Sequence, residues 1–76
     1  MSAGLDREIT ERVLRILERR DIRASEFSRG VGWSENRLSH LKNRQGSRWL
    51  VEELVEAAAF LRVPVMDLLR GPDQRR

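Results

Sequence analysis

The sequence predicts an all-α fold, a compact bundle of about five helices that contains a helix-turn-helix. Apolar residues recur three and four positions apart along most of the 76 residues, and no segment has the pattern of a strand. Glycines near the middle separate two short helical segments, which indicates a tight turn. A chain of this length makes one domain near the small end of what folds alone, and without cysteine it folds without disulfides.

We expect the first helix at residues 6–20. Its apolar stripe consists of Leu5, Ile9, Val13 and Ile16, with Leu17 beside it. The opposite face is charged and holds Arg7, Glu11, Arg15 and Glu18. Leu14 points away from the stripe and is left for another element to cover.

A second, short helix is expected at 24–29 and a third at 34–43. Gly30 and Gly32 are both placed in the turn between them, because glycine adopts φ > 0 without a steric penalty. Ser34 stands where the third helix begins, and its hydroxyl can accept a hydrogen bond from a free backbone N–H there.

The fourth helix is expected at 49–61. Its buried face comprises Leu50 or Val51, then Leu54, Val55, Ala58 and Leu61. Its acidic residues, Glu52, Glu53 and Glu56, suit the positive end of the helix dipole and are expected on a solvated face.

A fifth helix of one or two turns is expected to begin at Pro64, a residue favoured in a first helical turn, and to stop before Gly71. Its apolar residues are Val65, Met66, Leu68 and Leu69. Residues 1–71 are thus expected to form the domain, and residues 72–76 a short basic tail.

Positive charge is concentrated in the middle of the chain. Residues 20–48 carry seven basic and three acidic residues, whereas residues 49–69 carry one arginine and four acids, within a total net charge of +3. A basic segment of this kind is typical of a nucleic-acid-binding surface, and the alternative is a solvated basic face without a ligand.

Several classes of protein lack support in the sequence. Without cysteine there is no thiolate zinc site, and His40 is the only histidine, so neither a metal site nor a Ser–His pair has a supporting constellation. Paired carboxylates and a phosphate loop are also missing, so we expect no enzyme, no cofactor and no small-molecule ligand. No apolar run reaches the roughly 18 residues of a membrane span, and a signal peptide is absent, which favours a cytoplasmic protein.

The segment from Ile22 to Leu41 has the pattern of a helix-turn-helix, whose second helix can lie in a DNA groove. Two motifs carry a family resemblance: Phe27, Ser28, Gly32, Trp33, Ser34, Leu38 and Leu41, followed by Leu61, Val63, Leu68 and Leu69. Over about residues 22–71 the chain resembles the lambda repressor/Cro-like (XRE-type) helix-turn-helix domains. That resemblance implies a sequence-specific transcriptional regulator of double-stranded DNA, of the phage repressor, small bacterial regulator or antitoxin kind.

The third helix supplies the expected base contacts. With Leu38 and Leu41 on its inner side, about 100° per residue places the opposite polar side over Asn36, Ser39, His40 and Asn43. The resemblance points to Glu35, Asn36 and His40 for the same role. The residues expected at phosphates are Arg23, Ser25, Ser34, Arg37, Lys42, Arg44 and Arg48.

The resemblance has two departures. Ala24 stands where the family often has a phosphate-binding glutamine, a contact that Arg23 or Ser25 could take over, and Ser28 replaces an alanine.

Other readings of these residues stay open. Glu35 could favour the helix dipole or pair with Arg37, and His40 could be an ordinary surface residue. Trp33 is expected in the core, and Trp49 either packs in the core or at a helix start, or stacks on bases. A protein-interaction module built on the same fold is the alternative to a DNA-binding regulator.

We expect a homodimer, formed in solution or only on DNA, because regulators of this kind place two recognition helices about 34 Å apart. Met66 and Leu69 are the expected contact, since they form a second apolar pair on the fifth helix. In the alternative, Leu14 of the first helix covers that side.

Overall fold

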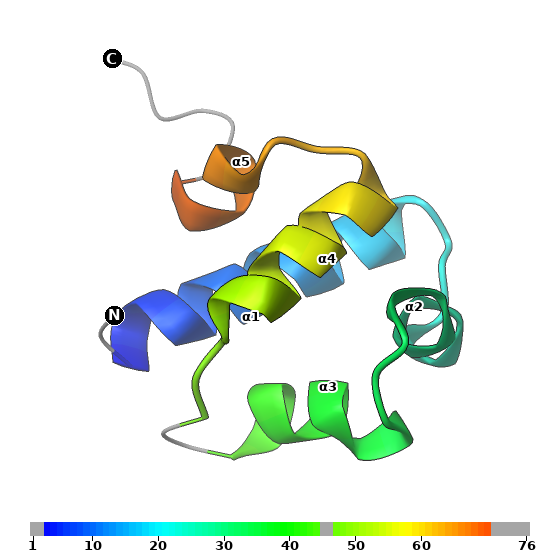
Figure 1. Cartoon of the computed structure of the whole chain (residues 1–76), viewed down its shortest axis with the longest axis horizontal. Helices are drawn as coiled ribbons and strands as arrows, with labels where there is room; N and C mark the ends of the chain where they lie inside the picture. The colour runs from blue at the N-terminus through cyan, green and yellow to red at the C-terminus, as the bar shows by residue number, and fades with distance from the viewer. Residues whose placement is uncertain (1–2, 45–46, 71–76) are drawn as a thin grey trace.

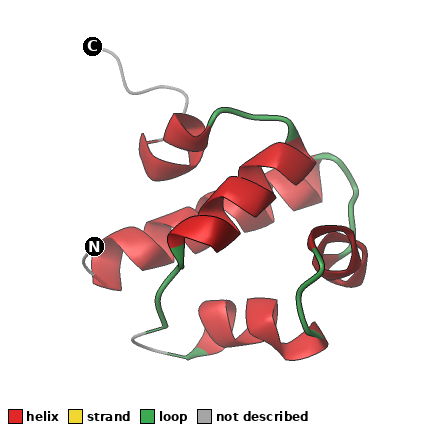
Figure 2. Cartoon of the chain, in the orientation of Figure 1, coloured by secondary structure: helices red, strands yellow, loops and turns green. Residues whose placement is uncertain are grey.

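In the computed structural model the described residues are 3–44 and 47–70, without the side chains of residues 3 and 35. Across these ranges the chain forms five helices and no strand (Figure 2), which confirms the all-α prediction. The helices are α1 (Ala3–Arg19), α2 (Ala24–Val31), α3 (Glu35–Asn43), α4 (Val51–Leu61) and α5 (Val65–Arg70). The basic tail at 72–76 lies outside the described residues.

The helices pack around a single apolar core. In Figure 1, α1 and α4 run through the middle of the view, with α3 below them, α5 above and α2 at the right. Helix α1 contacts α3 and α5, α2 contacts α3 and α4, and α4 contacts α5. The buried apolar side chains come from every helix and from one loop: Ile9, Val13, Leu17, Phe27, Leu38, Leu41, Trp49, Leu54, Ala57, Ala58, Leu61 and Leu68.

The beginning of α4 differs from the prediction. The helix starts at Val51 rather than at residue 49, and Leu50, Val51 and Val55 are 57%, 75% and 50% exposed. Trp49 precedes the helix and is buried at this end of the core. Ala57 is buried whereas Val55 is not, so the inner face of α4 consists of Leu54, Ala57, Ala58 and Leu61.

Helices α1, α2 and α4 end in the same way, at a residue in the left-handed conformation. These residues are Asp21 (φ 58°), Gly32 (φ 78°) and Arg62 (φ 59°). In α2 the N–H of Trp33 donates to the carbonyl of Ser28 at 2.9 Å, and the other two helices repeat this bond. This is a Schellman end, which satisfies carbonyls left free by the helix. The sequence predicts only the glycine member.

Gly30 was expected in the turn, but it lies inside α2. A Cβ atom at this position would overlap the ring of Phe60 on α4. The Phe60 ring in turn packs edge to face on Phe27, with centroids 5.4 Å apart. Gly30 is therefore needed for close approach of α2 to α4, whereas Gly32 alone supplies the positive φ of the turn.

Helix α5 is docked on α1 through an arginine. The Nη1 atom of Arg12 donates to the carbonyls of Leu68 and Leu69 at 2.7 Å each, and Leu68 is fully buried. Leu69 is half-buried against the core, while Met66 is 47% exposed. Leu14 lines a groove with residues of α2 and α3, so Arg12, and not Leu14, faces α5.

Candidate nucleic-acid interface

Helix α3 is held on the domain by its two inner leucines. Leu38 and Leu41 are both buried, as the spacing predicted. Ser34 occupies the residue before the helix, as expected, but its hydroxyl makes no cap hydrogen bond. Its carbonyl instead accepts a hydrogen bond from the Arg37 N–H at 3.2 Å, which closes the first turn through the backbone.

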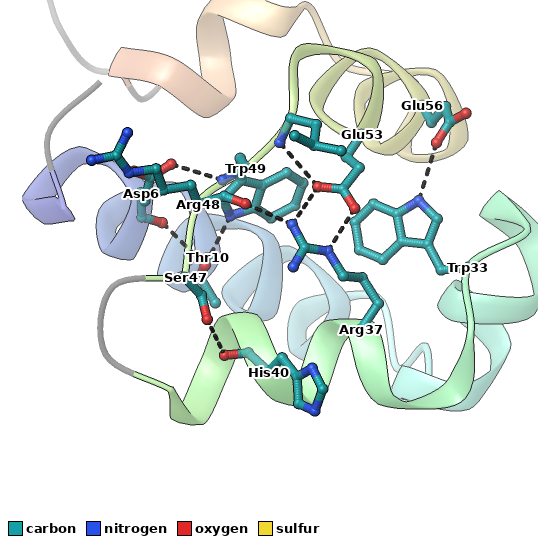
Figure 3. Close-up of polar contacts among 11 residues, drawn as sticks. Asp6, Thr10, Trp33, Arg37, His40, Ser47, Arg48, Trp49, Glu53 and Glu56 are labelled. Atoms are coloured by element: carbon teal, nitrogen blue, oxygen red, sulfur yellow. Dashed lines mark hydrogen bonds and ion pairs between the residues drawn. The ribbon is translucent and has the colours of Figure 1, made fainter.

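The outer side of α3 is polar. Asn36, Ser39 and Asn43 are exposed, and Asn43 Nδ2 donates to Ser39 Oγ at 3.2 Å, so these two side chains share one face. His40 is half-buried, and Figure 3 shows its ring pointing away from the contacts around Trp49. The side chain of Glu35 lies outside the described residues.

An open groove runs between α2 and α3. Its apolar floor includes Leu14, Trp33 and Leu38. Its polar lining consists of Ser25, Ser28 and Arg29 from α2, and of Ser39, Lys42 and Asn43 from α3. Ser25, which was expected to contact a phosphate from the second helix, therefore lines the same groove as Lys42 and Asn43 at the end of α3.

Most of the residues expected at phosphates are at the surface. The exposed ones are Arg23, Ser25, Ser34, Lys42, Arg44 and Arg48. Two of them, Ser25 of α2 and Lys42 of α3, line the same groove. The exposed set thus comprises two neutral hydroxyls and four cations.

Arg37 is placed differently from the other arginines. Its Nε and Nη2 atoms donate to Oε2 and Oε1 of Glu53, both at 2.6 Å, and Nη2 also donates to the carbonyl of Arg48 at 2.6 Å. The side chains of Arg37 and Glu53 are 25% and 12% exposed. Glu53 was expected on a solvated face, and this expectation is wrong because α4 presents it to α3.

The ionisation of the pair follows from these contacts. Burial disfavours the charged form of Glu53, but hydrogen bonds from Arg37 and from the Leu50 N–H outweigh burial and lower the pKa of the carboxyl group. The hydrogen bond to Glu53 raises the pKa of Arg37. Both groups are charged near neutral pH, so the guanidinium already has an anionic partner.

Residues 47–49, which precede α4, are held by hydrogen bonds to α3 and α1 (Figure 3). Ser47 Oγ donates to the His40 carbonyl at 2.9 Å. The Trp49 N–H donates to Asp6 Oδ1 and its indole Nε1 donates to Thr10 Oγ1, both at 2.9 Å. Asp6 and Thr10 are buried one turn apart on α1, and nothing in the sequence analysis singled them out. The available signal was two polar residues interrupting an apolar face.

The two tryptophans pack together with Phe27, Trp49 buried in the core and Trp33 half-buried against it. The Trp33 ring lies edge to face with Phe27 and with Trp49, at centroid distances of 5.3 and 5.5 Å. Trp33 Nε1 donates to Glu56 Oε1 at 3.1 Å. Trp49 is buried just before α4, so its predicted packing in the core or at a helix start is confirmed, and stacking on bases is not supported by its position.

Protein-family models, curated proteins and solved structures contain no match to this chain. Within residues 3–44 and 47–70, no three His, Cys, Asp or Glu side chains gather as a metal site would require. Over the same ranges the helices are too short or too polar to cross a bilayer.

Proposed function

We propose that this protein is a sequence-specific regulator that binds double-stranded DNA with α3 in the major groove, as its resemblance to the lambda repressor/Cro-like domains implies. One observation carries the proposal: α3 buries Leu38 and Leu41 and turns its polar side outward, within the most basic segment of the chain. A helix about 10–12 Å across fits a major groove about 12 Å wide.

The outward residues of α3 match the chemistry of base edges. Asn36 and Asn43 can each bond adenine through two hydrogen bonds, and Ser39 can bond either donors or acceptors. His40 lies on the same side of the helix and is proposed as a further base contact. Glu35 is proposed to accept from cytosine N4, a role that its residue type permits.

The phosphate contacts are proposed for the exposed residues around α3. Ser25 and Lys42 line the same groove, so one phosphate group could approach both. The remaining proposed contacts are Arg23, Ser34, Arg44 and Arg48. Arg37 is not proposed as a phosphate contact because its Nε and Nη2 atoms already donate to Glu53, and Nη2 also donates to the Arg48 carbonyl.

A second copy of the chain is the proposed partner on a two-fold site. Met66 is exposed enough to contribute to the expected α5 contact, whereas half-buried Leu69 has less surface to offer. Leu50, Val51 and Val55 are also exposed, and this apolar end of α4 is the observation that favours a protein-interaction module as the second candidate function.

Selection of bound sequences from random duplex DNA tests the main proposal. A regulator should enrich one sequence, and its affinity should fall steeply with salt because phosphate contacts release counterions. Asn36→Ala and His40→Ala should weaken binding to the selected site by about 5- to 150-fold and change binding to random DNA little. Glu11→Ala on the exposed face of α1 is the control. Failure to enrich any sequence, with no salt dependence, would favour the interaction module.

Sedimentation with a palindromic duplex tests the dimer. We expect two copies per duplex, and loss of the second copy in Met66→Asp or Val55→Asp identifies which surface joins them. A strict 1:1 complex that neither variant alters would end the dimer proposal.

A further inference from the structure

We infer that Glu53 is a positioning residue that sets the angle of α3 toward DNA through Arg37, and that Arg37 itself makes no phosphate contact. The inference rests on the proposed function. It concerns the same site, but its residue lies on α4, outside the helix-turn-helix.

The carboxylate of Glu53 joins three parts of the chain (Figure 3). It accepts two hydrogen bonds from Arg37 of α3 and one from the Leu50 N–H at 3.0 Å, just before α4. Arg37 Nη2 also reaches the Arg48 carbonyl in the connecting segment. A single ion pair therefore ties α3, the α3–α4 connection and the first turn of α4 together.

The geometry of this pair is directional. Two parallel N–H···O bonds between a planar guanidinium and a planar carboxylate define an orientation as well as a distance. The two leucines of α3 are attached by non-directional apolar contact, which tolerates small rotations of the helix. Arg37 is adjacent to Asn36 in the chain, so its orientation is transmitted directly to a proposed base contact.

Small changes in helix angle matter for reading bases. Hydrogen bonds from N–H to oxygen occupy a range of about 2.7–3.2 Å, so a shift of about 1 Å breaks a bidentate contact. Phosphate contacts made by long, exposed side chains follow such a shift more easily. A misplaced α3 should therefore lose sequence discrimination before it loses general affinity.

For an acidic residue that does not position α3, electrostatics predicts the opposite change in DNA affinity when its charge is removed. Removing an acidic residue near a DNA-binding surface weakens repulsion of phosphates and should strengthen DNA binding. Glu53→Gln and Glu52→Gln remove the same charge from neighbouring positions of α4, and Glu52 is exposed. On the inference, Glu53→Gln binds the selected site about tenfold or more weakly than the parent, whereas Glu52→Gln binds it equally or more tightly.

Arg37 variants separate positioning from phosphate binding. The plot of log affinity against log salt has a negative slope, and the magnitude of this slope decreases by about 0.9 for each phosphate contact that is lost. Arg37→Lys keeps the charge but cannot form the paired contact, so it should lose selected-site affinity while its salt slope stays that of the parent. Lys42→Met should lower the magnitude of the slope. A lowered magnitude in Arg37→Met, with full rescue by Arg37→Lys, would assign Arg37 to a phosphate and overturn the inference.

Amide hydrogen exchange tests the positioning step without DNA. In Glu53→Gln and Arg37→Lys, the amides of α3 should exchange faster than in the parent while those of α1 remain unchanged. Unchanged α3 exchange in both variants would overturn the inference, even if the parent binds DNA. A parent that binds no DNA removes the proposed function, and exchange still decides whether Glu53 fixes α3.

Discussion

Gly30→Ala is the substitution whose effect depends most directly on tertiary packing. Alanine is favoured over glycine inside a helix by about 1 kcal/mol, so the change would stabilise α2 considered alone. In the folded domain the new methyl group would overlap the ring of Phe60. Forcing an extra methyl into a packed contact costs about 1–3 kcal/mol. We expect a net loss of about 1 kcal/mol of unfolding free energy.

The Phe60 ring has little freedom to move aside. It is half-buried, and it packs edge to face on Phe27, which is fully buried. Moving the ring would disturb an aromatic pair worth about 0.5–1.5 kcal/mol beyond its buried area. Relief of the overlap should therefore come from removing the ring rather than from rearranging it.

Urea denaturation of four proteins provides the assay: the parent, Gly30→Ala, Phe60→Leu and the double variant. In the Phe60→Leu background the overlap is gone, so Gly30→Ala should become neutral or stabilising by up to about 1 kcal/mol. Gly32→Ala is the control, because its strain comes from φ alone and nothing lies near its Cβ, so its cost should be equal in both backgrounds. An equal effect of Gly30→Ala in both backgrounds would refute the assignment of this glycine to close approach.

Three further outcomes are expected from thermal or urea melts. Arg62→Gly should raise stability by about 0.5–1 kcal/mol, because glycine relieves a left-handed residue at the end of α4; a lower melting temperature would contradict this. Glu53 has a lowered pKa, so its ionised form stabilises the domain above its unfolded-state pKa of about 4.3, and that contribution is lost as the pH falls through the folded value. The stability advantage of the parent over Glu53→Gln should thus shrink as the pH falls below 5, and it should stay constant from pH 6 to pH 8. Asp6→Ala should cost about 1–3 kcal/mol by leaving the buried Trp49 N–H without its acceptor, whereas Arg7→Ala on the exposed face should stay within about 0.5 kcal/mol.

The sequence by itself determined the helices and the inward side of most of them. Spacings of three and four residues act within one helix, so Ile9 and Val13 on α1 and Leu38 and Leu41 on α3 are buried as predicted. Gly32 was also assigned correctly, since a positive φ is a local property of the chain. The outward position of Asn36 and Asn43 follows from the same local geometry.

Only the tertiary structure decided which elements meet and at what distance. The partner of Arg37 is sixteen positions away on another helix, and no local spacing distinguishes Glu53 from its neighbour Glu52. Gly30 was misassigned because its role depends on a ring brought to it by α4. Val55 was expected to be buried for a similar reason, since periodicity identifies an apolar face but not where the neighbouring helices stop covering it. Contacts between distant residues depend on packing angles that emerge only when all five helices share one core.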